Sequence, residues 1–370
     1  MRVLFAGGGT SGHLVPCLAV AQTLRRRHPD AEVEFVVSRR ATDRDMLAAR
    51  DFIARPISGS GMPYGLSATA FASLYRLGVG GCQALGIVKR FRPDVVFATG
   101  GFISAAVVTA AKVLRVPIML HASDAMPDRT NRLLARWADL VSTVSQSAAD
   151  QFKARRCVVT GQPVRPEVLE ADPSAARTEL GVPETAFVVL VTGGSQGAQR
   201  LNDATIAALP ELLANPDVHV IHLTGVGKLP NSGHRAALNL HRDRYLVEES
   251  RNDMANVLAA ADLVVTRAGA SSLAEASAWG RPMIVVPYPH AGGHQQHNAA
   301  IYEQAGAAIV VADAAFTAPR LTNLVARLQA DCERRRAMSQ AAVSIGTREA
   351  AAAVFGHLLT LLPSSPQAFH

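Results

Sequence analysis

Short runs of apolar residues alternate with amphipathic stretches along most of the chain. Residues 2–6 form an apolar run that leads into a glycine-rich segment, and residues 187–192 do the same half a chain later. After each glycine segment, apolar positions recur at the spacing of a helix. Further apolar runs, each predicted to be a strand, are Val33–Val37, Val95–Ala98, Ile118–Leu120, Leu140–Val144, Val218–Leu223, Leu263–Thr266 and Met283–Val286. Strands that alternate with helices predict an α/β protein with parallel sheets.

The repeat of strand, glycine loop and helix indicates two Rossmann-like domains. The loops are Gly7-Gly8-Gly9-Thr10-Ser11-Gly12-His13 and Gly193-Gly194-Ser195-Gln196-Gly197-Ala198. We place the first domain at residues 1–160 and the second at 166–345, with a hinge in the proline-containing segment 161–166. The length of 370 residues fits two domains. A single dinucleotide-binding dehydrogenase is the alternative, with Glu32 or Glu34 as its ribose-binding acid.

The amino-acid composition limits the classes of molecule that the protein is expected to bind. Hydrophobic residues make up 49% and charged residues 18%, which is typical of a packed globular protein. Lys and Arg outnumber Asp and Glu by 37 to 30, which favours phosphates or an acidic membrane surface. No nucleic-acid-binding motif is present, so nucleic acid is not an expected partner. The four cysteines are far apart and form no C-x-x-C pair, which fits a reducing cytoplasm. We expect no membrane-spanning segment, because no apolar run approaches ~20 residues, and no secretory leader is evident.

The segment Arg267–Glu275 is a candidate diphosphate site. It follows a predicted strand, so the residues from Gly269 onward would open a helix whose free N–H groups suit phosphate. Glu275, one turn further in, could accept hydrogen bonds from ribose hydroxyls. The alternative is ordinary helix capping, with a serine at the N-cap and a solvated glutamate in the first turns.

The segment Pro287–Ala299 is rich in amide and imidazole side chains. Neutral donors and acceptors of this kind suit sugar hydroxyls. Its three histidines permit a zinc site, but no carboxylate or cysteine completes the ligand set, so no metal is expected. His13, at the start of a predicted helix, is a candidate general base, because the positive helix end disfavours a protonated imidazole. A histidine that only caps a turn or binds substrate is the alternative.

Two further segments have competing interpretations. Asp43-Arg44-Asp45 offers an acid pair for a metal–diphosphate but is more simply the start of a helix. Residues 61–92 combine apolar residues with Lys89, Arg90 and Arg92, so they could lie on an anionic bilayer. A buried helix with a basic end explains that pattern equally well.

Six short motifs, in order along the chain, resemble the MurG-type N-acetylglucosaminyltransferases of glycosyltransferase family 28. They are Gly8–His13, Thr99–Phe102, Gly161–Arg165, Gly193–Ala198, Arg267–Glu275 and His294–Ala299. The resemblance implies the GT-B fold, two facing Rossmann-like domains with an interdomain cleft. It also implies a metal-independent, cofactor-free, inverting reaction. The helical stretch at about 348–362 would pack back on the first domain.

The resemblance also implies roles for individual residues. His13 would act on the attacking hydroxyl. The acceptor would lie against Gly9, Thr10, Ser11, Gly12, Gly100, Gly101 and Asp124. The donor would lie against Arg165, Ser195, Arg251, Ala270, Ser271, Ser272, Glu275, Gln295 and Asn298.

Two segments depart from the family pattern. His121 is followed by Ala122, where the family has a glutamate, and then by Ser123 and Asp124 in place of an amide pair. The nucleobase-side loop reads Ser250-Arg251 where the family has Phe-Ile, and Arg251 could stack on the base instead.

The resulting prediction is transfer of N-acetylglucosamine from its UDP donor to a lipid-diphosphate-linked muramoyl peptide in peptidoglycan synthesis. The reaction would occur at the inner face of an anionic cell membrane. Three alternatives remain open. They are a related transferase with another acceptor, such as a natural product or glycolipid, a UDP-N-acetylglucosamine epimerase, and a nucleotide-binding protein without catalysis.

Overall fold

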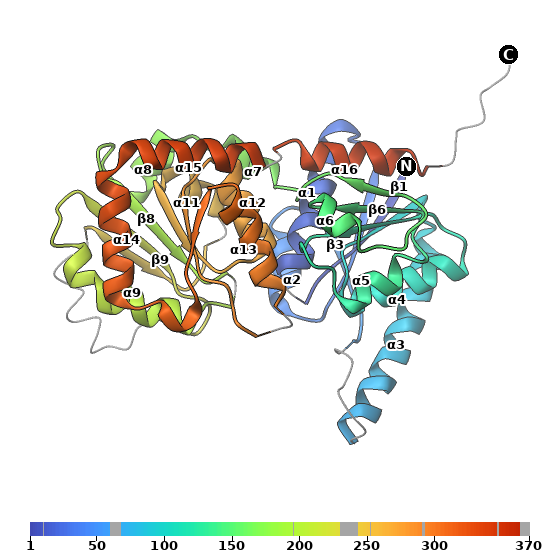
Figure 1. Ribbon diagram of the computed structural model, residues 1–370. Helices are drawn as coiled ribbons and strands as arrows, with labels where there is room; N and C mark the ends of the chain where they lie inside the picture. The colour runs from blue at the N-terminus through green and yellow to red at the C-terminus, as the bar shows by residue number, and fades with distance from the viewer. Residues whose placement is uncertain are drawn as a thin grey trace, which may run out of the picture. The chain divides into compact units, whose positions relative to one another are not determined.

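The structure, a computed structural model, describes residues 1–9, 11–59, 68–194, 196–229, 243–251, 253–290, 293–345 and 348–362. Of residues 11 and 68–76 it describes the backbone only. The chain divides into two compact units (Figure 1). Unit 1 consists of Met1–Arg165 together with Glu349–His370, and unit 2 of Pro166–Arg348.

Unit 1 is built on a parallel sheet of seven strands in the order β3-β2-β1-β4-β5-β6-β7. Its strands are β1 (Arg2–Ala6), β2 (Glu32–Val37), β3 (Ile53–Pro56), β4 (Val95–Ala98), β5 (Ile118–Ala122), β6 (Leu140–Thr143) and β7 (Cys157–Val159). Its helices are α1 (Ser11–Arg27), α2 (Ala41–Ala48), α3 (Ala68–Phe91), α4 (Gly101–Val113), α5 (Arg129–Leu134), α6 (Gln146–Ala149) and α16 (Ala350–Leu359).

The two central strands of unit 1 are buried on both faces from Val3 to Ala6 in β1 and from Val95 to Ala98 in β4, which is why these stretches read as unbroken apolar runs. Val3 and Phe5 of β1 point to one side, where α1 and α16 cover the sheet. Leu4 and Ala6 point to the other side, against α3 and α4. Within the first layer the rings of Phe5 and Phe35 stack with centroids 5.1 Å apart. The alternation follows from the two-residue period of a strand.

Unit 2 has a parallel sheet of six strands in the order β10-β9-β8-β11-β12-β13. Its strands are β8 (Phe187–Thr192), β9 (Val218–Leu223), β10 (Tyr245–Glu248), β11 (Leu263–Thr266), β12 (Met283–Val285) and β13 (Ala308–Val310). Its helices are α7 (Pro166–Glu170), α8 (Pro173–Leu180), α9 (Gln199–Leu212), α11 (Met254–Ala260), α12 (Ala270–Ala278), α13 (His294–Gln304), α14 (Ala318–Ala330) and α15 (Cys332–Ile345), with a 3₁₀ turn at Asp313–Ala315.

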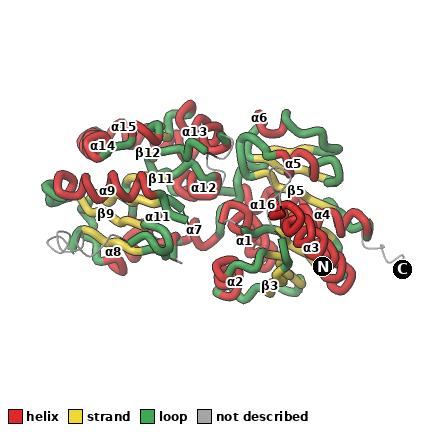
Figure 2. Tube along the Cα trace, turned by 90° about the horizontal axis from the view of Figure 1, so that it is seen from below, coloured by secondary structure: helices red, strands yellow, loops and turns green. Residues whose placement is uncertain are grey.

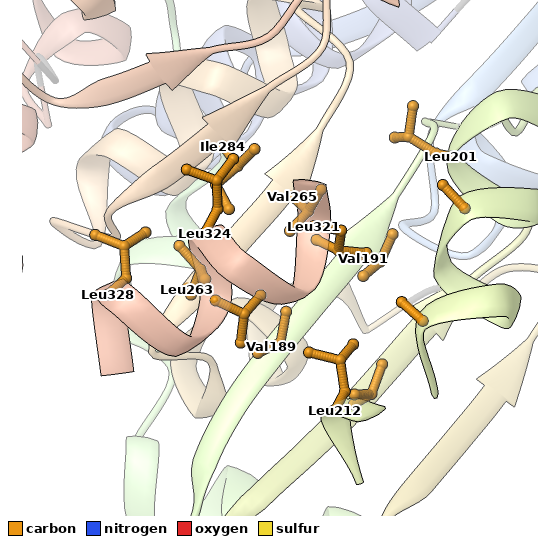
Figure 3. Packing of buried hydrophobic residues seen from close by; sticks show 14 of the residues in the cluster. Val189, Val191, Leu201, Leu212, Leu263, Val265, Ile284, Leu321, Leu324 and Leu328 are labelled. Carbon is orange, nitrogen blue, oxygen red and sulfur yellow. The ribbon is translucent and has the colours of Figure 1, made fainter. Parts of the chain in front are cut away.

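The main core of unit 2 lies between its sheet and two helices. Leu321, Leu324 and Leu328 form one stripe of α14 and pack over β8 and β11, as Figure 3 shows. Leu201 and Leu212 of α9 extend the same layer. Figure 2 shows the strands of each unit between layers of helices. The predicted α/β class with parallel sheets is confirmed.

Both sheets share one topological feature that locates a ligand site. The strand order reverses between β1 and β4 in unit 1 and between β8 and β11 in unit 2. In open α/β sheets, ligands bind beyond the carboxyl ends of the strands at such a reversal. The four segments that follow these strands are Gly7–Gly9, Thr99–Gly101, Gly193–Ala198 and Arg267–Gly269. Each is part of a motif singled out in the sequence.

Candidate active site

The first glycine loop fits closely against its own helix. A Cβ atom on Gly7 would lie 2.6 Å from the carbonyl oxygen of His13 and 2.8 Å from Oγ1 of Thr99. Both distances are below van der Waals contact, so a side chain at position 7 would push the loop away from α1. Glycine therefore brings the end of β1, the start of α1 and the end of β4 together.

Two side chains after β2 hold this loop from the other side. Oδ2 of Asp43 accepts hydrogen bonds from the Gly9 N–H at 2.8 Å and from the Ser38 hydroxyl at 2.5 Å. Nη1 of Arg40 donates to the Gly9 carbonyl. Asp43 lies in the first turn of α2, so the helix-start interpretation of Asp43–Asp45 is confirmed, yet the residue is only 4% exposed. No local pattern in the sequence predicts the contact with Gly9, 34 residues away.

His13 lies in the first turn of α1 and is tied to the end of β4. Its Nδ1 atom is 3.1 Å from the carbonyl oxygen of Thr99. A carbonyl oxygen only accepts hydrogen bonds, so Nδ1 carries the proton and Nε2 of the neutral ring is left as the acceptor. The Oγ1 atom of Thr99 in turn donates to the His13 carbonyl at 2.7 Å. This arrangement presents the nitrogen that a general base requires.

Gly100 and Gly101 lie beside this histidine, at the start of α4. A Cβ atom on Gly101 would be 3.4 Å from both Cδ2 and Nε2 of His13, and its φ of +74° is one that other residues rarely adopt. The N–H of Gly100 donates to Oγ of Ser104 at 3.0 Å. A Cβ atom on Gly100 would lie 2.4 Å from Oδ1 of Asn131. Gly101 therefore leaves space next to Nε2 that a side chain would occupy, and Gly100 allows the close approach of Asn131.

The remaining acceptor-side candidates lie in or next to these elements. Gly12 is in the first turn of α1 and Ser11 begins that helix, whereas Thr10 lies outside the described residues. Asp124 follows β5 and is half-buried. Ala122, at the position of the family glutamate, is buried at the end of β5.

His121 is buried in the same strand and is fully hydrogen-bonded. Its Nε2 donates to Oε1 of Gln162 at 3.0 Å, and the Ser142 hydroxyl donates to its Nδ1 at 3.0 Å. Burial lowers the pKa of His121 to about 4. This neutral ring links β5 and β6 to the segment that leads to Arg165, which is itself buried at the end of unit 1.

In unit 2, α12 begins at the expected place but not by the expected capping pattern. Gly269 is its N-cap and no side chain caps the helix, while Ala270, Ser271 and Ser272 form its first turn. Glu275 is only 6% exposed. The capping interpretation, with a serine N-cap and a solvated glutamate, is therefore wrong. The first N–H groups of α12 lack intrahelical partners, as at any helix start, and suit an anion.

Gln295 and Asn298 both contact the residue that precedes this helix start. Oε1 of Gln295 accepts a hydrogen bond from the Ala268 N–H at 3.2 Å, and Nδ2 of Asn298 donates to the Ala268 carbonyl at 3.1 Å. The predicted sugar-binding segment and the predicted diphosphate segment are thus adjacent. Ser195, the donor-side residue of the second glycine loop, lies outside the described residues.

Arg251 has a different environment from the one expected. Its guanidinium forms a two-point ion pair with Asp253, with Nε–Oδ1 at 2.8 Å and Nη2–Oδ2 at 2.9 Å. Nη1 also donates to Glu248 at 2.9 Å. A guanidinium held in one plane by two carboxylates is not free to turn onto a base, so stacking by Arg251 would require both ion pairs to break.

Glu34, one of the two acids that the dehydrogenase alternative offered for a ribose, is already paired with arginines. Glu34 accepts two hydrogen bonds from Arg55, at 2.9 and 2.7 Å, and one from Arg90 at 3.2 Å. These arginines lower the pKa of the Glu34 carboxyl, with the Arg55 hydrogen bond as the largest cause. In the described part of the chain, no three His, Cys, Asp or Glu side chains lie together as a metal site would need. Among the described helices, none combines the length and apolarity needed to cross a bilayer.

Two parallel sheets, each with a glycine loop and a second loop at its reversal point, define the class of two-domain GT-B glycosyltransferases and related nucleotide-sugar enzymes. Residues 3–143 match the glycosyltransferase family 28 N-terminal domain, and residues 188–354 match the glycosyltransferase family 28 C-terminal domain. The chain belongs to glycosyltransferase family 28 and is a glycosyltransferase.

Individual relatives agree with this assignment. The chain is 39% identical over 357 residues to the UDP-N-acetylglucosamine--N-acetylmuramyl-(pentapeptide) pyrophosphoryl-undecaprenol N-acetylglucosamine transferase of Desulforudis audaxviator, covering 94% of each chain. The structure of the present chain is similar to that of Acinetobacter baumannii MurG. The TM-score is 0.68, and the identity is 24% over 97% of this chain and 99% of that one. It is also similar to S. aureus MnaA with UDP, with a TM-score of 0.70 and 15% identity over the whole of both chains. The structural similarities confirm the predicted GT-B class, and the relatives confirm the resemblance to the MurG type.

Proposed function

We propose that this protein transfers N-acetylglucosamine from UDP-N-acetylglucosamine to the C4 hydroxyl of a muramoyl peptide linked to undecaprenyl diphosphate. Membership of family 28 and the name of the Desulforudis relative support this substrate pair. The observation that carries the chemistry is the His13–Thr99 hydrogen bond, which leaves Nε2 as a proton acceptor. Transfer to an alcohol requires such an acceptor.

The reaction follows from the roles of the two units. Nε2 of His13 takes the proton of the acceptor hydroxyl as its oxygen attacks the anomeric carbon of the donor sugar. The bond from that carbon to the UDP oxygen breaks on the opposite face, so the anomeric centre inverts. Negative charge that develops on the leaving diphosphate is stabilised by the N-terminus of α12, at Ala270, Ser271 and Ser272. No metal is required for this step.

The acceptor side uses unit 1. The diphosphate of the lipid would lie near the glycine loop Gly9–Gly12 and the start of α1, where the helix end favours an anion. The Gly9 N–H already donates to Asp43, so Gly9 would shape the loop rather than bind phosphate directly. Gly101 would leave room for the acceptor sugar at His13, Gly100 would shape the same turn, and Asp124 would contact polar groups of the sugar.

The donor side uses unit 2 together with Arg165. Glu275 would accept hydrogen bonds from the ribose hydroxyls, and Ser195 and Arg165 would contact the donor phosphates. Gln295 and Asn298 would lie at the N-acetylglucosamine. Arg251 would contribute to the nucleobase side through the position of its loop rather than by stacking.

With a lipid-linked acceptor, the transfer reaction would take place at the inner face of the cell membrane. The solvent face of α3 combines the exposed Leu85 with Lys89, and the end of α4 exposes Val113, at 67%, beside Lys112. Apolar residues beside basic ones suit the surface of an anionic bilayer. This arrangement supports peripheral attachment.

The experiment that tests the proposal is UDP release from UDP-N-acetylglucosamine in the presence of chelator, with and without a soluble muramoyl-diphosphate-lipid analogue. We expect release that depends on the analogue. UDP binding without such release would contradict the acceptor assignment. Release of the 2-epimer of the donor sugar would favour an epimerase instead.

A second candidate is a family 28 transferase with a different acceptor, such as a natural product or a glycolipid. It is favoured by the replacement of the family glutamate with Ala122 and of the neighbouring amide with Asp124, because both changes fall at the end of β5 on the acceptor side. An acceptor screen at fixed UDP-N-acetylglucosamine separates the two. Faster turnover of a non-muramoyl acceptor would favour this second candidate.

A further inference from the structure

Gln295 uses its amide oxygen for contacts within the protein. Oε1 accepts two backbone hydrogen bonds, from the Ala268 N–H at 3.2 Å and from the Tyr288 N–H at 2.9 Å. Ala268 lies between β11 and α12, and Tyr288 lies in the loop after β12. One side chain from the first turn of α13 therefore joins two neighbouring loops at the carboxyl edge of the sheet.

The same short segment is held from two other sides. Nδ2 of Asn298, one turn after Gln295 on α13, donates to the Ala268 carbonyl at 3.1 Å. Nη1 of the buried Arg267 donates to the Val286 carbonyl at 3.1 Å and to Oδ1 of Asp313 at 2.5 Å. Both backbone polar groups of Ala268 and the side chain before it are thus fixed immediately before the N-cap, Gly269.

The hydrogen bonds of Gln295 and Asn298 to Ala268 lie next to the start of α12, which has no capping side chain of its own. At many helix starts a Ser, Thr, Asp or Asn side chain fixes the first turn, but Gly269 has no side chain to do so. The direction in which the first N–H groups of α12 point then depends on the peptide that precedes them. A displacement of about 1 Å at such a site is enough to weaken binding and catalysis strongly.

We propose that Gln295 is a positioning residue for the donor diphosphate, which it serves by holding Ala268 and hence the start of α12. The inference rests on the proposed function, because it takes the N-terminus of α12 as the diphosphate site. It differs from a simple sugar contact, because the oxygen is committed to the backbone. Both hydrogen bonds of its side chain go to backbone N–H groups, so the contacts that carry this role lie within the protein.

The test is calorimetric titration with UDP, which has no sugar, and with UDP-N-acetylglucosamine. A positioning role predicts that Gln295→Leu weakens both ligands together, by about fivefold or more, because two backbone N–H groups lose their partner. Gln296→Leu, a change at the neighbouring exposed glutamine, is the matched control and should leave UDP affinity unchanged. Loss of UDP-N-acetylglucosamine affinity with normal UDP affinity would overturn the proposal in favour of a sugar contact.

Hydrogen–deuterium exchange of the same folded variants provides the second measurement. The Ala268 and Tyr288 amides should exchange faster in Gln295→Leu and at the wild-type rate in Gln296→Leu. Gln295→Glu keeps the accepting oxygens, so slow exchange should return at both amides. Unchanged exchange at both amides in Gln295→Leu would show that Gln295 does not hold these two backbone groups. Failure of the wild-type protein to bind UDP would instead contradict the proposed function, so the two failures are distinguishable.

Discussion

His13 and Thr99 form a reciprocal pair of hydrogen bonds. The Nδ1–H of His13 donates to the Thr99 carbonyl at 3.1 Å, and the Thr99 hydroxyl donates to the His13 carbonyl at 2.7 Å. The pair connects residues 86 positions apart in the chain and fixes both the plane of the imidazole and the nitrogen that carries its proton. A catalytic base needs this kind of fixed orientation before the acceptor arrives.

Replacement of His13 should therefore abolish turnover and leave the affinity for the UDP donor unchanged. We expect His13→Ala to lower kcat by about 10²–10⁴-fold, the usual contribution of a general base, with UDP affinity unchanged. His13→Asn is the sharper variant, since its amide can still donate to the Thr99 carbonyl but has no atom at the position of Nε2. Steady-state kinetics and UDP titration check both. Substantial turnover by His13→Asn, or equal losses of turnover and UDP affinity, would show that His13 is not the base.

Gly101→Ala should impair catalysis by filling the space next to Nε2. The new Cβ atom would lie 3.4 Å from the His13 ring, and a φ of +74° adds about 1 kcal/mol of backbone strain. Gly181→Ala is the matched control, because Gly181 has a similar φ of +67° and nothing within 4 Å of the added atom. Both variants should lose similar stability in thermal unfolding, and only Gly101→Ala should lose turnover. A turnover loss in both would attribute the effect to strain alone.

Asp43→Ala should loosen the first glycine loop. Removal of the carboxylate leaves the Gly9 N–H and the Ser38 hydroxyl without their acceptor, at a cost of about 1–3 kcal/mol in the free energy of unfolding. We also expect a higher KM for the acceptor and an unchanged KM for UDP-N-acetylglucosamine. The exposed Asp45 provides the control, with an expected change within about 0.5 kcal/mol for Asp45→Ala. Equal effects of the two substitutions would argue against a specific role for Asp43.

His121 should make the stability of the protein depend on pH between about 6.5 and 4. Burial lowers its pKa to about 4 in the folded protein, whereas an unfolded histidine titrates at about 6.5. As pH falls through this window the unfolded chain binds a proton that the folded chain does not, so the free energy of unfolding decreases, by up to about 3 kcal/mol. Burial also lowers the pKa of His222 to about 4, so His222 adds to the slope.

Urea unfolding at a series of pH values measures this dependence. His121→Asn should flatten the slope between pH 6.5 and 4.5, although the variant is less stable at pH 7 because Ser142 and Gln162 lose their partner. His28→Asn, at an exposed position, is the control and should keep the wild-type slope. An unchanged slope in His121→Asn would contradict a neutral buried ring.

The strands that the sequence predicted correctly are those in the middle of each sheet. Val95–Ala98 and Leu263–Val265 are covered on both faces and consist of apolar residues only, so each run is visible without any structure. The strands that were missed are shorter or lie towards the edges of their sheets. β3 and β7 contain partly exposed residues, and their pattern is too weak to distinguish from a loop.

The candidate site shows a similar division. Arg267–Glu275 was found because glycine after an apolar run is a local signal, whereas Thr99–Phe102 was found only through the family resemblance. The partners of these motifs were not found. Asp43 reaches Gly9, and Asp313 reaches Arg267, through contacts that only the fold creates. Arg251 forms ion pairs with Glu248 and Asp253, which are close in sequence. Their spacing alone does not show that the three side chains face one another.

The position of α16 has a consequence for how the protein is made. Val354, Phe355 and Leu358 of this helix belong to the same core as Leu14 and Leu18 of α1, although the whole of unit 2 lies between them in the chain. A ribosome therefore releases all of unit 2 before it has synthesised the residues that complete unit 1. Unit 2 can fold during translation, whereas unit 1, which carries His13, keeps part of its apolar surface uncovered until α16 is synthesised. A chain cut short before α16 would expose that surface and become a target for chaperones and proteases.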